Sequence, residues 1–291
     1  MPYKPEIKQD RRNVITIRYD DIAAGWESWV LLVSDAHHDS RYCDRDLEKR
    51  HLQMAKDRGA LIFHFGDTFD AMQGKFDPRR SLSNVRPEDA RVDYFDAIVE
   101  HAADFYGEYA DNFVLFAKGN HETAVLDKTN TDLISNLVYR MNAEYISGNH
   151  RIYTGGYGGW LRFMFQVNKT KRCSIQAKYH HGSGGVAPVT RGVIQTNRQA
   201  VFLPDADIVI NGHNHQSYIM PIARERLSRV GKVQKDLCWF VRIPGYQNAY
   251  GDGAEGYAVE KNTGPTPHGA IWLRFYVDGS VVNVQPQPEM E

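Results

Sequence analysis

Short apolar runs bounded by turn residues recur along the chain, and in its first half they alternate with longer segments of mixed polarity. The short runs predict buried strands, whereas apolar residues at helical spacing predict helices. The predicted strands are NVITIRY (13–19), WVLLVSD (29–35), ALIFHFGD (60–67), NFVLFAK (112–118), DIVINGHNH (207–215), CWFVRI (238–243) and AIWLRFYV (270–277). The predicted helices cover 44–58, 87–106, 131–142 and 190–202.

The second half is richer in consecutive strands and includes a predicted β meander over 151–181. This order of elements predicts a mixed α/β sandwich and not a purely parallel barrel. No internal repeat is visible, and no linker rich in Pro, Ser or Gly divides the chain. We therefore expect a single domain over 1–291, with the glycine-rich stretch 244–269 as a long loop on it.

Composition narrows the class of protein. The chain has 291 residues, of which 42% are apolar and 24% charged, as in soluble globular proteins. A net charge of −1 gives no basic surplus for nucleic-acid binding. No apolar run approaches the ~20 residues of a membrane span, and MPYKPEIKQDRRN lacks the apolar core of a signal peptide. The three cysteines are not in CxxC pairs, so we expect free thiols in a reducing cytoplasm.

Histidine changes the picture, because 7 of the 12 histidines, counting His38 beside His37, stand where predicted strands end. The strand exits contain Asp35-Ala36-His37, Gly66-Asp67 with Asp70, Gly119-Asn120-His121-Glu122, His180-His181-Gly182 and Gly212-His213-Asn214-His215. One such residue usually caps a turn. Five exits together predict a shared site, since ligands of open α/β sheets bind outside the carboxyl ends of the strands. His64, between phenylalanines, is predicted to be a core histidine, and His51, His101, His150 and His268 have no predicted role.

The residue types at these exits indicate metal binding. Imidazole and carboxylate without cysteine suit Mn, Fe, Zn or similar divalent ions. The ligands are too many for one tetrahedral ion and about right for two ions that share a bridging carboxylate. Asn120 is neutral where an aspartate would add negative charge, so the site stays positive and attracts a phosphate ester.

The blocks DAH, GDTFD, GNHE, HHG and GHNH, in this order over 35–215, resemble the calcineurin-like metallophosphoesterase superfamily. Its signature is D-x-H, GD-x-x-D, GNH-E/D, H and GH-x-H. The resemblance implies a four-layer α/β/β/α sandwich of two mixed β-sheets flanked by helices. The tail GYAVEKNTGPTPHGAIWLRFY is similar to uncharacterised phosphoesterases of phages and bacteria.

The resemblance also implies a role for each site residue. Asp35, His37 and His215 would bind the first metal, Asp67 would bridge the pair, and Asn120, His213 and one of His180 or His181 would bind the second. The family ligand usually precedes glycine, which favours His181. His121 would be the catalytic histidine that protonates the departing oxygen, held by Asp70. The cofactors would be two divalent ions, with manganese expected first and Fe, Zn, Ni or Mg as alternatives.

The substrate is less well determined than the reaction. The protein phosphatases of the superfamily carry arginine after the second aspartate of GDxxD, where this chain has Ala71. Three arginines predicted to lie on loops could replace this missing charge: Arg79, Arg80 and Arg191. An arginine on a loop is, however, more often simply a solvated surface charge. The repair nucleases of the superfamily need a C-terminal extension, and the tail after His215 is short.

Aromatic residues of that tail offer a second clue. Tyr246, Tyr250, Tyr257 and Trp272 suit stacking on bases, but a β-hairpin with a long loop explains them equally well. The sequence therefore favours a phosphodiesterase acting on a nucleotide or nucleic acid. The alternatives are a phosphomonoesterase, acting on protein or small molecules, and a catalytically inactive binding scaffold. The sequence sets neither the oligomeric state nor the biological substrate.

Overall fold

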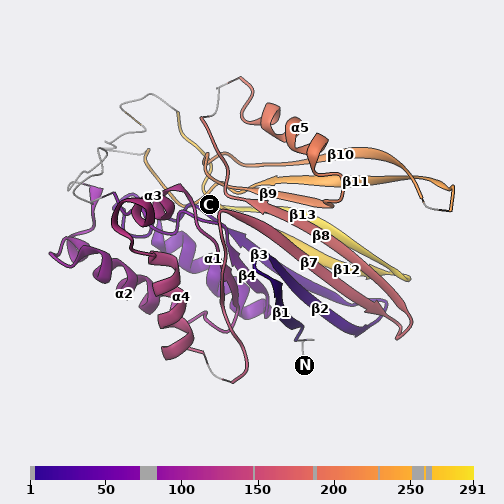
Figure 1. The fold of residues 1–291 in the computed structure, drawn as a ribbon, viewed down its shortest axis with the longest axis horizontal. Coiled ribbons are helices and arrows are strands. Elements are labelled where there is room, and N and C mark those ends of the chain that lie inside the picture. Colours follow the sequence, from indigo (N-terminus) through magenta and orange to yellow (C-terminus); the bar gives the residue numbers. More distant parts are fainter. Residues whose placement is uncertain are drawn as a thin grey trace.

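The computed structural model describes residues 4–72, 84–146, 148–185, 189–228, 230–250, 259 and 264–291. Its strands form two mixed sheets, one of six and one of seven strands. The sheets pack face to face, four helices cover one side, and a fifth helix lies on the other (Figure 1). This arrangement confirms the four-layer α/β sandwich, although a single short helix forms the fourth layer.

The six-stranded sheet has the order β13-β12-β3-β4-β5-β6. Its strands are β3 (Glu27–Val33), β4 (Leu61–His64), β5 (Phe113–Phe116), β6 (Tyr153–Thr154), β12 (Gly269–Asp278) and β13 (Val281–Met290). Strands β3 to β6 run parallel, and β12 joins β3 antiparallel. The short, fully buried β4 and β5 have no polar alternation because both of their faces are covered.

The seven-stranded sheet has the order β1-β2-β7-β8-β9-β11-β10. Its strands are β1 (Glu6–Arg11), β2 (Val14–Ile22), β7 (Gly158–Val167), β8 (Lys171–His180), β9 (Ile208–Asn211), β10 (Tyr218–Leu227) and β11 (Val233–Arg242). In β7, buried Leu161, Phe163 and Phe165 alternate with less buried residues, which is the pattern of a sheet with one covered face. These side chains enter the core between the two sheets.

Helices α1 (Arg45–Arg58), α2 (Tyr94–Gly107), α3 (Asn120–Thr129) and α4 (Leu133–Glu144) lie on the side of the six-stranded sheet. Residues of α1, α2 and α4 form a second core with the outer face of that sheet. Helix α5 (Val193–Phe202) covers a small apolar cluster on the seven-stranded sheet. No described helix is long and apolar enough to cross a membrane.

Several elements differ from the sequence prediction. The helix expected over 87–106 begins only at Tyr94, because Pro87–Asp89 forms a separate 3-10 turn in which buried Asp89 bonds the His101 ring at 2.6 Å. The meander expected over 151–181 is split, since β6 pairs with β5 in the other sheet. Strands β1 and β13 and helix α3 were not predicted. Residues 251–258 and 260–263 of the glycine-rich stretch lie outside the described part of the chain.

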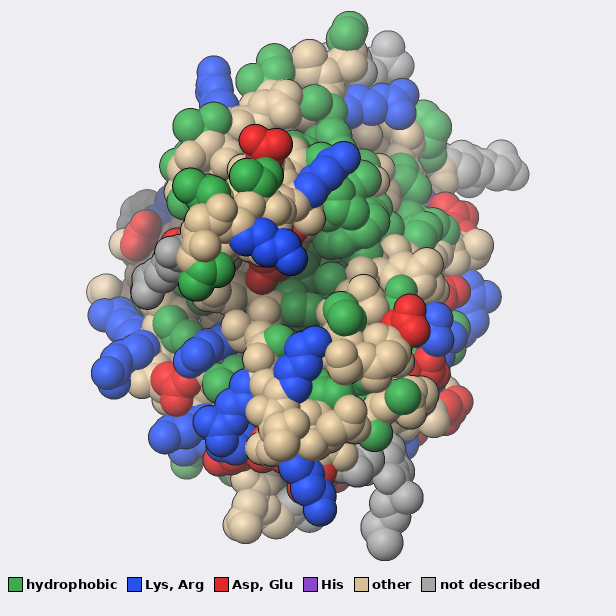
Figure 2. Space-filling view, turned by 90° about the vertical axis from the view of Figure 1, so that its right-hand side faces the viewer, with side chains coloured by type: hydrophobic (Ala, Val, Ile, Leu, Met, Phe, Trp, Pro, Cys, Tyr) green, Lys and Arg blue, Asp and Glu red, His purple; other side chains and the backbone are tan. Residues whose placement is uncertain are grey.

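The end of the sandwich that carries the hairpin turns lies on the right in Figure 1. Viewed from there, hydrophobic side chains gather around a hollow in the surface (Figure 2). Exposed apolar residues of the strands that reach this end include Leu227, Val233, Leu237 and Val281. The histidine-rich strand exits lie at the other end of the sandwich: β8, for example, starts at its turn with β7 and ends at His180.

Candidate metal centre

The segments that follow β3, β4, β5, β8 and β9 meet at one place between the two sheets. The His213 backbone N–H, after β9, donates to both carboxylate oxygens of Asp35, after β3, at 2.9 Å. The His181 ring, after β8, lies 3.0 Å from the Asp67 carboxylate, after β4. Because β3 to β5 are parallel, and β8 and β9 likewise, their carboxyl ends face the same space.

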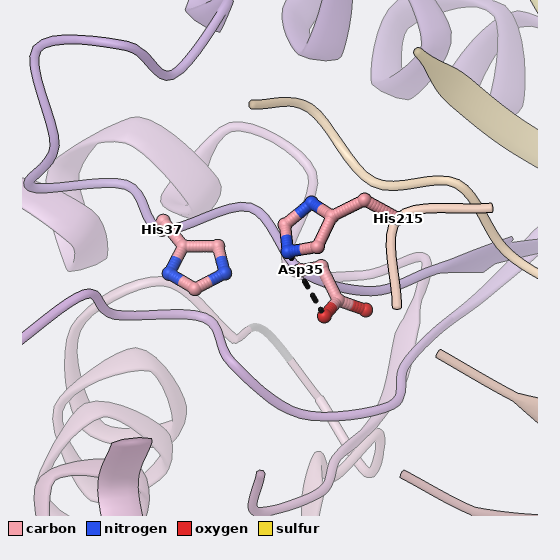
Figure 3. A group of neighbouring side chains, drawn as sticks. All are labelled: Asp35, His37 and His215. Atoms are coloured by element: carbon pink, nitrogen blue, oxygen red, sulfur yellow. Dashed lines mark ion pairs between the residues drawn. The ribbon is translucent and has the colours of Figure 1, made fainter. Parts of the chain in front are cut away.

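Asp35, His37 and His215 form the first group of potential ligands, with one ligand atom of each within 4.8 Å of the others. Figure 3 shows the His215 ring directly beside the Asp35 carboxylate, with the His37 ring next to them and His215 coming from a different segment of the chain. The His215 Nε2 lies 3.8 Å from Asp35 Oδ1, and the rings of His37 and His215 stack with centroids 5.3 Å apart. Ser34 Oγ donates to Asp35 Oδ2 at 2.5 Å and orients the carboxylate.

Asp67, His181 and His213 form the second group, again within 4.8 Å of one another. The Asn120 side-chain oxygen lies 2.6 Å from His213 Nδ1 and 3.2 Å from His181 Nε2. His181 Nδ1 faces the Phe65 carbonyl at 2.9 Å, so this nitrogen carries a proton, and Nε2 is the nitrogen that can bind a cation once its own proton is displaced. Neighbouring His180 is not in either group, because its Nδ1 accepts the Gly182 N–H at 3.1 Å.

The ring of His37 has a buried nitrogen that a bound cation would satisfy. His37 Nδ1 bonds Asp70 Oδ1 at 3.1 Å, which fixes the proton on Nδ1. Its Nε2 is buried and has no hydrogen-bond partner among the described residues. An unpaired buried ring nitrogen costs about 1–3 kcal/mol. A divalent ion held with Asp35 would satisfy it, because a neutral imidazole nitrogen is a common metal ligand.

His121 lies beside both groups of potential ligands but is a member of neither. Its backbone N–H donates to Asp67 Oδ1 at 3.0 Å, and its ring packs edge-on against that of His37. The ring nitrogen Nδ1 contacts the main-chain carbonyl of Asp70 at 2.5 Å, whereas the Asp70 carboxylate is 3.8 Å away. Asp70 therefore lies next to His121 as expected, but its nearest contact is made by the backbone.

The backbone of the centre is strained. Asp35, His37, Asp67, His213 and His215 have φ between 48° and 74°, the left-handed region that residues other than glycine rarely occupy. Each such residue costs on the order of 1–3 kcal/mol, and such residues cluster at functional sites. The strain is a signal of function that the sequence alone does not contain.

Two acidic residues that sequence reasoning missed hold the ligand segments in place. Glu122 is 1% exposed and accepts the backbone N–H groups of Asp67, Phe69 and Gly119 at 2.8–3.1 Å. Asp39 accepts those of Asp70 and Ala71 at 2.6 and 3.0 Å. The E of GNHE was a signal for the first of these, and the D of DAHHD was a weaker signal for the second.

The carboxylates of the centre control the protonation of its histidines. Burial lowers the pKa of His37, but the hydrogen bond to Asp70 and the charge of Asp67 outweigh it and raise the pKa to about 9. Burial likewise lowers the pKa of His181, and the charges of Asp67 and Asp35 raise it to about 10. Both imidazoles are therefore protonated at neutral pH when no cation is bound.

Residues given no role in the site have ordinary partners. His64 is buried in the core, with Nδ1 3.2 Å from Thr68 Oγ1. His51, His101, His150 and His268 contact Tyr246, Asp89, Phe113 and Glu291 respectively.

The aromatic residues proposed to stack on bases are largely unsuited to this. Tyr246 and Trp272 are 0% and 1% exposed, so their rings are packed in the core and cannot receive a base. The burial of these two rings shows that the predicted stacking of Tyr246 and Trp272 on bases was wrong. Arg191 is exposed, whereas Tyr257, Arg79 and Arg80 lie outside the described residues.

Comparison of the sequence with protein-family models and with curated proteins gives no match. Among solved structures, the chain is similar to vacuolar protein sorting 29 from Cryptosporidium parvum (11% identity, 91% of this chain and 100% of that one, TM-score 0.39). It is also similar to GAP50, the anchor in the inner membrane complex of Plasmodium (14%, 89% and 84%, TM-score 0.44). A third is the calcineurin-like phosphoesterase YfkN from Bacillus subtilis (12%, 91% and 90%, TM-score 0.32). Because these values are low, function is inferred below from the chain's own side chains.

Replacing Glu122 by glutamine should destabilise the protein and weaken metal binding, although Glu122 is not a ligand. Glutamine keeps one acceptor oxygen but turns an NH₂ group toward backbone donors, so we expect a loss of about 1–3 kcal/mol in the free energy of unfolding. Urea unfolding and Mn²⁺ titration measure the two effects. Glu108→Gln, at a side chain 51% exposed, is the control and should change stability little. Equal stability of the two variants would contradict the role given to Glu122.

Metal affinity of the stripped protein should rise with pH, because a cation must displace protons from His37 and His181. Both groups have pKa values near 9 or above, so each ion competes with about one proton through the neutral range. The apparent affinity for Mn²⁺ should increase about tenfold per pH unit between about pH 6 and 8. Calorimetric titration at several pH values tests this, and a flat profile would show that the ligands are not protonated in the free protein.

Proposed function

We propose that the chain is a metal-dependent phosphoester hydrolase with a dinuclear centre. The observation that carries this proposal is the convergence of two carboxylate–imidazole groups on one space, with the buried Nε2 of His37 left unpaired. The order of the five sequence blocks, which resembles that of the calcineurin-like metallophosphoesterases, supports the same reading. A single domain over 1–291 would carry the whole activity.

The ligand geometry supports a division of the residues between two ions. Asp35, His37 and His215 would hold the first ion, Asn120, His181 and His213 the second, and Asp67 would lie between them. Mn²⁺ is the ion we expect first, while Fe, Zn, Ni and Mg also accept these ligands. When bound, the ions would acidify a water molecule and bind the oxygens of the phosphoryl group.

His121 is the residue we propose as general acid. Since its Nδ1 faces the Asp70 carbonyl, Nδ1 carries a proton and donates a hydrogen bond to that oxygen. Nε2 is therefore the nitrogen that can give a proton to the substrate. Nε2 lies 3.8 Å from Asp67 Oδ2, on the side of the centre. The imidazolium can therefore give its Nε2 proton to the departing oxygen while Asp70 holds the ring in place. Such help accounts for roughly 10²–10⁴ in rate.

The substrate we propose is a phosphodiester of a nucleotide or nucleic acid. The absence of an arginine at Ala71 supports this choice over a protein phosphatase, since that buried position offers no charge to clamp a monoester dianion. A phosphomonoesterase is the second candidate, because Arg191, exposed on a loop, would replace the missing arginine that clamps a monoester dianion. Free cysteines support a reducing compartment such as the cytoplasm as its location.

Two variants separate the proton donor from the metal ligands. His121→Ala should keep its metal ions and lose about 10²–10⁴-fold in turnover, because only the proton donor is removed. Asp67→Ala should lose metal as well as turnover, because it removes the proposed bridge. Elemental analysis beside kinetics measures both effects. His150→Ala, which removes a ring that contacts the Phe113 carbonyl, is the control. A metal-free His121 variant would refute the role assigned to it.

Hydrolysis of two simple esters distinguishes the candidate functions. With Mn²⁺ present, we expect faster hydrolysis of bis-p-nitrophenyl phosphate than of p-nitrophenyl phosphate, as a diesterase requires. Activity on the monoester alone would instead establish a monoesterase. Activity on neither, in protein that retains its metals, would leave the binding scaffold as the correct reading.

A further inference from the structure

A separate cluster of potential ligands lies between α1, α2 and the segment that joins β3 to α1. His38 and Cys43 belong to this segment, and Glu48 lies on α1. The three residues are 1%, 5% and 0% exposed, and one ligand atom of each lies within 4.8 Å of the others. His38 follows His37 but faces the helix layer, where its ring packs on Phe105 with centroids 4.6 Å apart.

The polar atoms of this cluster are unsatisfied. Both ring nitrogens of His38 and the Oε2 of Glu48 are buried without a hydrogen-bond partner among the described residues. Glu48 Oε1 accepts the Tyr106 hydroxyl at 2.7 Å, so the carboxylate is anchored and its free oxygen points toward His38. His38 Nδ1 and Glu48 Oε2 are 3.8 Å apart, which is too far for a hydrogen bond. Each unpaired buried group costs about 1–3 kcal/mol, so a missing partner is indicated.

We propose that His38, Cys43 and Glu48 bind a third divalent cation of the zinc type, separate from the dinuclear centre. Sulfur, nitrogen and carboxylate oxygen are the three ligand types that Zn²⁺ takes in proteins. Metal–ligand distances of about 2.0–2.3 Å place neighbouring ligand atoms of a tetrahedral site ~3.3–3.7 Å apart. The observed 3.8 Å spacing of nitrogen and oxygen is close to this range. A thiolate and a carboxylate also balance the charge of the ion.

The segment is held in position by contacts that need no ion. Arg45 donates from Nε and Nη2 to the His38 carbonyl at 3.1 and 2.8 Å. Arg86 donates from Nη2 to the Cys43 carbonyl at 2.7 Å. The ligands are thus preorganised, and an ion would enter a site whose backbone is already fixed.

Protons compete with the ion for the same atoms. Burial raises the pKa of Glu48 to about 7, and burial together with the charge of Glu48 raises that of the Cys43 thiol well above its usual value. Without a cation the cluster is therefore close to uncharged, which is how a buried site of this kind avoids the cost of isolated charges. Binding would release protons.

The third ion would stabilise the support of the dinuclear centre. Between His38 and Cys43 lies Asp39, whose carboxylate accepts the backbone N–H groups of Asp70 and Ala71. Tying this segment to α1 would restrict the motion of Asp39, and also of His37 next to it. The role is one of positioning, and it does not require the third ion to touch the substrate.

Cobalt substitution tests the proposal with a readout independent of activity. The dinuclear centre has only nitrogen and oxygen ligands, so a thiolate-to-cobalt charge-transfer band in the near ultraviolet can report only a cysteine site. Chelator-stripped protein titrated with Co²⁺ should show this band and bind three ions. Cys43→Ala should lose the band and bind one ion fewer. Cys238→Ala, at a cysteine 3% exposed under α5, should keep the band and all three ions.

Two further variants keep the test decisive. Glu48→Gln, which retains the bulk and the contact with Tyr106, should weaken the Co²⁺ affinity measured from the band by about tenfold or more. This variant keeps the proposal testable if Cys43→Ala does not fold. Asp67→Ala should keep the band while losing the other ions, so failure of the proposed function is separable from failure of this site. Wild-type protein without the band, or a band that survives in Cys43→Ala, would overturn the proposal.

Discussion

Two buried carboxylates, Asp35 and Asp67, impose the central constraint on this fold. They are 0% and 2% exposed and stand at the ends of adjacent parallel strands. A buried unpaired charge costs several kcal/mol, so each must be compensated. Here the compensation comes from imidazoles of the other sheet and from backbone N–H groups, of which the His213 N–H is one. The two sheets are thus joined at this end by charge, while their apolar core joins them elsewhere.

The close approach of the segments explains the glycines beside the ligands. A Cβ on Gly119 would collide with the Asp67 carboxylate, and one on Gly212 would collide with Ser34 and with Asp35. Together with five ligands in the left-handed conformation, these contacts show that much local stability is given up to bring the ligands together. The dense apolar cores on both sides of the six-stranded sheet hold this strained region in place.

The sequence predicted the convergence of the strand exits because apolar runs followed by polar residues leave a local pattern. The order of elements also predicted a mixed α/β sandwich, whereas its division into two sheets was implied by the resemblance to the metallophosphoesterases. It missed α3, since the apolar periodicity of Asn120–Thr129 is weak and only Glu122 and Val125 are buried. It could not show that the Asp70 backbone holds His121, or that His38, Cys43 and Glu48 meet. Such contacts depend on three-dimensional approach and on backbone atoms, which carry no signal in the order of residues.

A dinuclear centre would be visible by anomalous diffraction from crystals of the Mn²⁺-loaded protein. We expect two peaks about 3.5–4 Å apart, one beside Asp35, His37 and His215 and one beside Asn120, His181 and His213, with Asp67 between them. A single peak, or none in the space between these residues, would contradict the dinuclear centre.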